Sequence, residues 1–145
     1  MTAVPPEEAP QRAGAELAAR CDAIEEAYEF MLAYASQGLP SEHGSASGSQ
    51  IREYLRRFDA ALTGLDDVLS RAIERHELQP APAYGAFIDV LRRDARDAQA
   101  SLQLAMAQPA IGSQLIDNLN ASIHLRALLT DLFLIDEILK ALPQP

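Results

Sequence analysis

The stretch IREYLRRFDAALTGLDDVLSRAIERH, residues 51–76, carries the clearest pattern in the chain. Its apolar side chains recur at alternating spacings of four and three residues, which places them on one face of an α-helix. We therefore predict one long helix over about 49–77, only mildly interrupted by Gly64. It begins near Ser47 or Ser49, and Ser47 and Gln50 have capping-box spacing. The seam of this helix consists of Ile51, Leu55, Phe58, Leu62, Leu65, Leu69, Ala72 and His76.

The same spacing predicts further helices over about 15–37, 83–106 and 114–142. Pro80 stops the preceding helix, and Ser113 is a suitable N-cap for the last one. Roughly seven-residue repeats favour left-handed packing at about 20 degrees. The sequence thus predicts an all-α fold, a four-helix bundle in up-down-up-down order, although a crossover between the first two helices stays open.

Two segments lack this periodicity. Residues 1–13 hold prolines and glutamates and predict a disordered N-terminal tail, which leaves 14–145 as a single helical-bundle domain. Residues 38–48 are rich in glycine and serine and predict a flexible loop whose length matters more than its chemistry. A loop that a ligand or partner orders is the alternative.

Composition and charge limit the classes of partner. A chain of 145 residues with 48% apolar and 23% charged residues is typical of one folded domain. Its net charge of -9 repels nucleic-acid phosphates and anionic lipids, so we expect neither nucleic acid nor a membrane as a partner. The first residues lack the pattern of a secretory signal, and the expected location is therefore cytoplasmic.

The sequence offers little that predicts catalysis or metal binding. The di-iron centres of helical bundles use Glu-x-x-His pairs, and none of the three histidines has a glutamate three positions before it. Cys21 and His76 both fall on seams, which indicates a small buried hydrophobic side chain and a partly buried or capping histidine. We expect no catalytic residue, no metal and no cofactor.

His124 has the most polar surroundings of the three histidines. Asp117, Asn120 and Asp131 fall with it on one stripe of the predicted helix 114–142, an arrangement that would hold and polarise an imidazole. A surface histidine on an acidic four-helix bundle resembles a histidine-phosphotransfer domain in outline. That family has His-x-Leu-Lys-Gly, whereas this chain reads His124, Leu125, Arg126, Ala127, with the basic residue one place early and no glycine. The resemblance implies phosphotransfer only as a remote alternative.

The segment 125–142 is apolar around most of its circumference, with twelve of eighteen residues apolar. A helix in a small bundle should keep a polar strip, so this one is either fully enclosed or part of an interface. We expect a non-enzymatic interaction module, an accessory, assembly or regulatory protein that forms a homodimer or docks on a larger protein. The predicted interface residues are Leu125, Leu128, Leu129, Leu132, Phe133, Leu134, Ile135, Ile138, Leu139 and Leu142.

The alternative function is a small-molecule sensor with a ligand inside the bundle. Its basis is a set of tyrosines on or beside the apolar stripes, Tyr28, Tyr34, Tyr54 and Tyr84. Nothing in their spacing selects a ligand, and the sequence alone places no pair of carboxylates face to face.

Overall fold

The computed structural model describes residues 9–142, and this part of the chain is all-helical, without a strand. The first helix, α1 (Ala9–Ala35), begins earlier than predicted, so residues 9–13 belong to a helix and not to a tail. Residues 1–8 of the predicted tail lie outside the described residues. The other helices are α2 (Gly48–Leu62), α3 (Leu65–Arg75), α4 (Ala81–Met106), α5 (Ser113–Ala121) and α6 (Ile123–Lys140).

The single helix predicted over 49–77 is wrong, because the chain breaks between α2 and α3. Thr63 has extended backbone angles, and Gly64 adopts a left-handed conformation with φ of 75°. Glycine enters this region without the steric penalty that a Cβ imposes. The seam continues across the break, since Leu62 and Leu65 on either side of it are both buried. His76, predicted as the last seam residue, is the exposed C-cap of α3.

The single helix predicted over 114–142 is wrong for a similar reason. Ser122 separates α5 from α6 with an extended ψ of 143°. Its side chain accepts a hydrogen bond from the amide of Leu125 at 3.4 Å, as the N-cap of α6. Over residues 9–142, the two breaks turn the four predicted helices into six.

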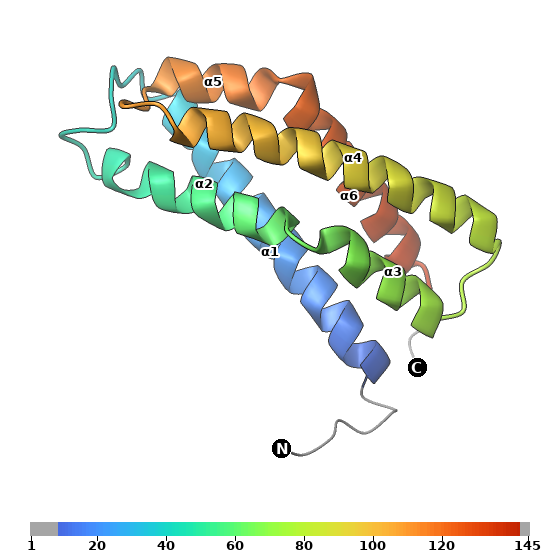
Figure 1. Ribbon diagram of the computed structural model, residues 1–145. Coiled ribbons are helices and arrows are strands. Elements are labelled where there is room, and N and C mark those ends of the chain that lie inside the picture. The colour runs from blue at the N-terminus through green and yellow to red at the C-terminus, as the bar shows by residue number, and fades with distance from the viewer. Residues whose placement is uncertain (1–8, 143–145) are drawn as a thin grey trace.

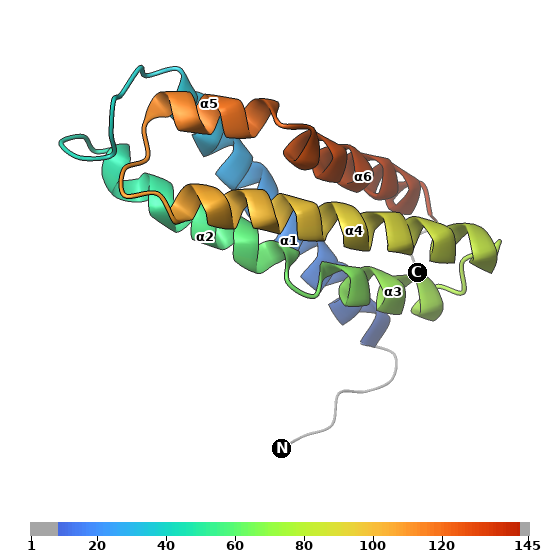
Figure 2. The same cartoon turned by 45° about the horizontal axis from the view of Figure 1, so that its top comes forward.

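The two longest helices, α1 and α4, pack against the shorter helices that lie between them. α1 contacts α2, α3 and α5, while α4 contacts α2, α3, α5 and α6 (Figures 1 and 2). α6 lies mainly against α4, whereas α5 lies against α1. The break at Ser122 therefore separates a segment that closes on α1 from a segment that follows α4.

Apolar side chains from all six helices meet in one core. Fully burying a Leu, Ile or Phe side chain contributes about 1.5–3 kcal/mol each, which makes this core the main source of stability. Tyr34 is one of its largest members, and its hydroxyl donates a hydrogen bond to the carbonyl of Ile111 at 2.6 Å. That bond ties the end of α1 to the connection before α5.

Candidate interaction surface

The ten predicted interface residues, all on α6 except Leu142 just after it, divide into two sets. The first set lies in the core of this same chain, with at most 5% of each side chain exposed. These side chains pack against the other helices and are not available to a partner. Five of the ten predicted residues are therefore core residues: Leu125, Leu128, Leu129, Leu132 and Ile135.

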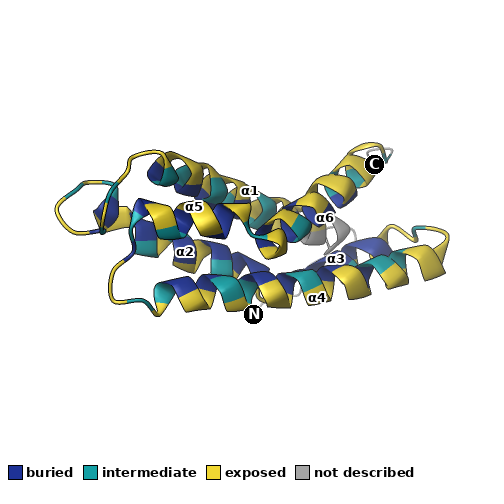
Figure 3. Cartoon of the chain, turned by 90° about the horizontal axis from the view of Figure 1, so that it is seen from above, coloured by how far each residue is buried: buried dark blue, intermediate teal, exposed yellow. Residues whose placement is uncertain are grey.

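The second set stays at the surface. Phe133, Leu134 and Ile138 are 56%, 52% and 38% exposed, and Leu139 and Leu142 are half-buried. Ile123, which was not predicted, is 75% exposed at the start of the same helix. Exposed and buried residues accordingly alternate along α6 (Figure 3). We call the four exposed apolar side chains, Ile123, Phe133, Leu134 and Ile138, the α6 outer strip.

The charged groups beside the strip carry both signs. Lys140 forms an ion pair with Asp136 at 2.7 Å, and this hydrogen bond raises the pKa of Lys140 above its ordinary value. Arg126 and Glu137 are exposed, and neither forms an ion pair within the described range. The outer face of α6 is thus close to neutral, although the chain as a whole has a net charge of -9.

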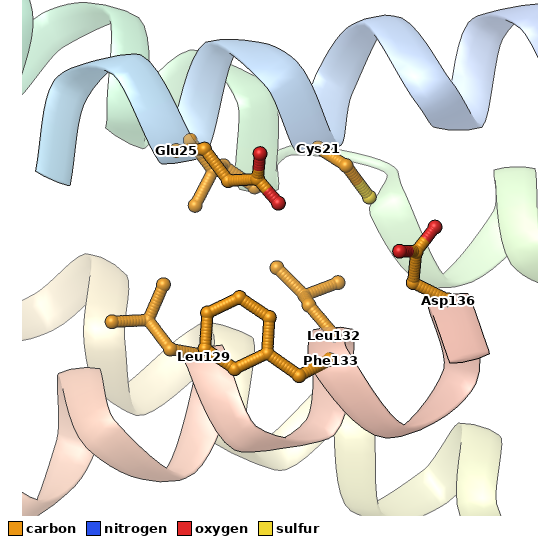
Figure 4. A pocket seen from close by; sticks show the side chains of 7 residues that line it. Cys21, Glu25, Leu129, Leu132, Phe133 and Asp136 are labelled. Carbon is orange, nitrogen blue, oxygen red and sulfur yellow. The ribbon is translucent and has the colours of Figure 1, made fainter. Parts of the chain in front are cut away.

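A narrow crevice separates α6 from α1 beside Phe133. Figure 4 shows Cys21 and Glu25 of α1 opposite Leu129, Leu132, Phe133 and Asp136 of α6. Its volume of about 10 Å³ leaves room for no more than about one water molecule. The crevice is therefore a narrow gap between two packed helices and is too small for an organic ligand.

Cys21 in this crevice is a protonated thiol. Burial raises the pKa of Cys21 to about 11, and the neighbouring carboxylates of Asp136, Glu25 and Asp22 add to the shift. The thiolate is the nucleophilic form of cysteine, and it is rare at neutral pH when the pKa is this high. The geometry gives Cys21 the chemistry of a small apolar side chain.

The polar stripe predicted around His124 is not formed. Because the chain breaks at Ser122, Asn120 and His124 lie on different helices. The Asn120 side chain is buried and donates from Nδ2 to the carbonyl of Met31 at 3.1 Å, while His124 is exposed. Asp131 is buried and faces Asp94 of α4. A uniform helical wheel over 114–142 could not predict this separation.

The four tyrosines do not line the open hollow between α4 and α5. Tyr34 is fully buried with its hydroxyl bonded, and the other three are half-buried. An open hollow of about 540 Å³ lies instead between the end of α4 and α5, where Leu104, Gln108 and Leu115 are among its lining residues. Apolar side chains with a few amide and hydroxyl groups form this surface.

Sequence reasoning missed a buried ion pair near the start of α2. The carboxylate of Glu42 accepts hydrogen bonds from the Arg52 guanidinium and, at 3.1 Å, from the amide of Ile111. Arg52 also donates to the carbonyls of Met106 and Gln108, at 2.8 Å each. The Arg52 hydrogen bond is the main cause that holds the pKa of Glu42 below its ordinary value.

This ion pair ties the segment 38–48 to α2 and to the end of α4. Glu42 comes from a glycine- and serine-rich stretch with no periodicity, so no spacing pattern indicated that its side chain is buried. Its contacts explain how the ends of three segments are held together, and its polar atoms are all engaged within the chain. We assign it a structural role.

Over residues 9–142, none of the helices combines the length and apolar character that crossing a bilayer requires. In the same range, no three His, Cys, Asp or Glu side chains gather as a metal site would need. Comparison of the chain with protein-family models, curated proteins and solved structures finds no match.

Proposed function

We propose that the chain is a non-enzymatic helical interaction module, an accessory, assembly or regulatory protein. It self-associates or docks on a larger protein through the α6 outer strip. In this proposal α1, α2 with α3, α4, and α5 with α6 act as four rods of alternating direction with left-handed packing. Their role is to present α6 at the edge of the molecule.

One observation carries the proposal. The inner face of α6 already completes the core of the chain, yet Phe133 and Leu134 remain more than half exposed beside it. Clustered exposed side chains of this size favour association with another surface, because covering them removes apolar area from water. The nearly neutral charge of the surrounding groups lowers the electrostatic penalty of covering them.

The test replaces Leu134 with Asp. Leu134 is 52% exposed, so we expect the melting temperature to change little, whereas a charge in the middle of the strip should abolish association. Sedimentation velocity across the micromolar range measures the assembly of the wild type and of Leu134→Asp.

Leu104→Asp is the matched control. Leu104 is 67% exposed but lies on α4, away from the strip, so this variant should assemble as the wild type does. A wild type that sediments as a monomer of 15.8 kDa at every concentration contradicts self-association. Capture of a cellular partner that survives Leu134→Asp contradicts docking through the strip.

A small-molecule sensor is the second candidate function. It is supported by the open hollow of about 540 Å³ between α4 and α5, which is within the size range of ligand sites. The hollow differs from the Tyr-lined interior expected from the sequence. A ligand bound there should raise the melting temperature saturably, and Leu104→Asp should weaken that effect.

A further inference from the structure

Two exposed charged residues of α6, Arg126 and Glu137, lack an ion pair in the described chain and have a specific geometric relation. Arg126 and Glu137 are eleven residues apart, which is about three helical turns, so both lie on the same side of the outer strip. The distance between them along the helix is about 16 Å, too long for a direct ion pair. Phe133 lies between them on the same side.

We propose that the partner of the α6 outer strip is a second copy of this chain, whose α6 packs antiparallel to the first. This inference rests on the function proposed above and specifies its partner and register. A two-fold axis near Thr130 and Phe133 places Arg126 of one subunit beside Glu137 of the other, and the same contact repeats by symmetry. Two reciprocal ion pairs then flank the apolar strip.

The direction follows from the symmetry. In an antiparallel pair, the two-fold axis is perpendicular to both helices. A residue on one side of the strip then faces the partner residue on that same side of the partner's strip, so Arg126 of one subunit meets Glu137 of the other. In a parallel pair, the axis exchanges the two sides, and both charges stay without a partner of opposite sign. Charge complementarity therefore selects the antiparallel arrangement.

Charge also favours a second copy over a basic partner. A strongly basic partner would bind where acidic side chains gather, but the outer face of α6 carries Arg126 and Lys140 beside Asp136 and Glu137. A surface with equal numbers of positive and negative groups can be electrostatically complementary to the same surface of an antiparallel second copy. Contact through this face also keeps most of the remaining net negative charge of the two chains away from the interface.

The experiment uses charge reversal at the two positions in the full chain. In Arg126→Glu, both reciprocal contacts become Glu against Glu, and in Glu137→Arg both become Arg against Arg. Each single variant should raise the dimer dissociation constant at least about tenfold in sedimentation equilibrium. The double variant Arg126→Glu/Glu137→Arg restores opposite charges at both contacts and should recover the wild-type constant.

Mixing the two single variants gives a sharper readout. A heterodimer of Arg126→Glu with Glu137→Arg has opposite charges at both contacts, so an equimolar mixture should dimerise at a concentration at which each component alone is mostly monomeric. Circular dichroism melting checks that every variant is folded; both positions are exposed and their replacement should leave the core intact.

The outcomes separate this inference from the function on which it rests. If the wild type dimerises and Leu134→Asp abolishes the dimer, but the single charge variants associate as the wild type does, the antiparallel register is wrong and the interaction surface stands. If the double variant or the mixture fails to recover association, the register is likewise overturned. A wild type that is monomeric throughout overturns both.

Discussion

Asp131 of α6 faces Asp94 of α4 across the contact between these two helices. Asp131 is buried, and its Oδ2 has no hydrogen-bond partner among the residues that the structure describes. Burial, followed by the hydrogen bond and the charge of Asp94, raises the pKa of Asp131 to about 7. Two facing carboxyl groups that are partly shielded from water are most stable when one of them holds a proton, because two negative charges would repel each other.

Asp131→Asn should stabilise the protein at high pH. A free aspartate has a pKa of about 3.9, so between about pH 4 and 7 the folded chain binds a proton at Asp131 that the unfolded chain lacks. The free energy of unfolding therefore falls as pH rises through this window and stays low above it. Asparagine removes the charge, and urea unfolding should show a gain of roughly 1–2 kcal/mol at pH 8 that vanishes near pH 4.

The control for this prediction is Asp97→Asn, on the exposed side of α4. Its effect on the free energy of unfolding should be small and similar at both pH values. A loss of stability in Asp131→Asn at pH 8 would show that the folded protein stabilises the Asp131 carboxylate, contrary to the geometry.

The sequence predicted the helical seams better than the points where helices break. The buried positions Ile51, Leu55 and Phe58 follow the predicted spacing, because burial of one helix face imposes its period on the sequence. The breaks at Gly64 and Ser122 each depend on the backbone angles of one or two residues. Glycine and serine also occur inside helices, so composition alone does not mark these positions as breaks.

The interaction surface was predicted only in part. The excess of apolar residues over 125–142 indicated that the segment has more apolar surface than one helix face can hide. It could not indicate whether Leu132 or Leu134 faces outward, because the direction of α6 is set by the break at Ser122 and by packing on α4. The Asp94–Asp131 pair depends on the register of two helices and has no signal in either one alone.

Glu42→Gln should destabilise the protein at neutral pH. The glutamine side chain has nearly the same shape as glutamate, but it leaves the partly buried guanidinium of Arg52 without its anion. Losing one member of such a pair costs about 1–3 kcal/mol when the partner is partly open to solvent. Urea unfolding at pH 7 measures this loss.

The pH dependence of Glu42→Gln identifies the ion pair as the cause. The pKa of Glu42 is held below its ordinary value, so its stabilising effect is complete above the unfolded pKa and is lost as pH falls through the folded one. The difference between wild type and variant should therefore shrink in acid. Glu53→Gln, whose exposed carboxylate pairs with Arg56 and Arg57, should cost less than about 0.5 kcal/mol.

Gly48→Ala and Gly85→Ala should change stability in opposite directions. A Cβ at Gly48 would lie 1.8 Å from the carbonyl oxygen of Glu42, so the backbone near the ion pair must move, at a cost of about 2–4 kcal/mol. A Cβ at Gly85 in α4 meets nothing within 4 Å, and alanine there should stabilise the helix by about 0.5–1 kcal/mol. Thermal unfolding of both variants measures these changes. An equal loss of stability in the two variants would contradict the described position of the segment 38–48.

Cys21 should react slowly with disulfide reagents while the protein is folded. Its pKa of about 11 is two units above the reference value of 9.0, so the thiolate fraction at pH 8 is about a hundredfold lower than in the unfolded chain. Reaction with an aromatic disulfide, followed by absorbance in buffer and in urea, measures this ratio. Asp136→Asn removes the carboxylate that contributes most to the raised pKa of Cys21 and should accelerate the reaction of the folded protein, whereas Asp97→Asn should not. A folded-state rate equal to that in urea would place Cys21 in open solvent, and α6 would then not close over α1 at this crevice.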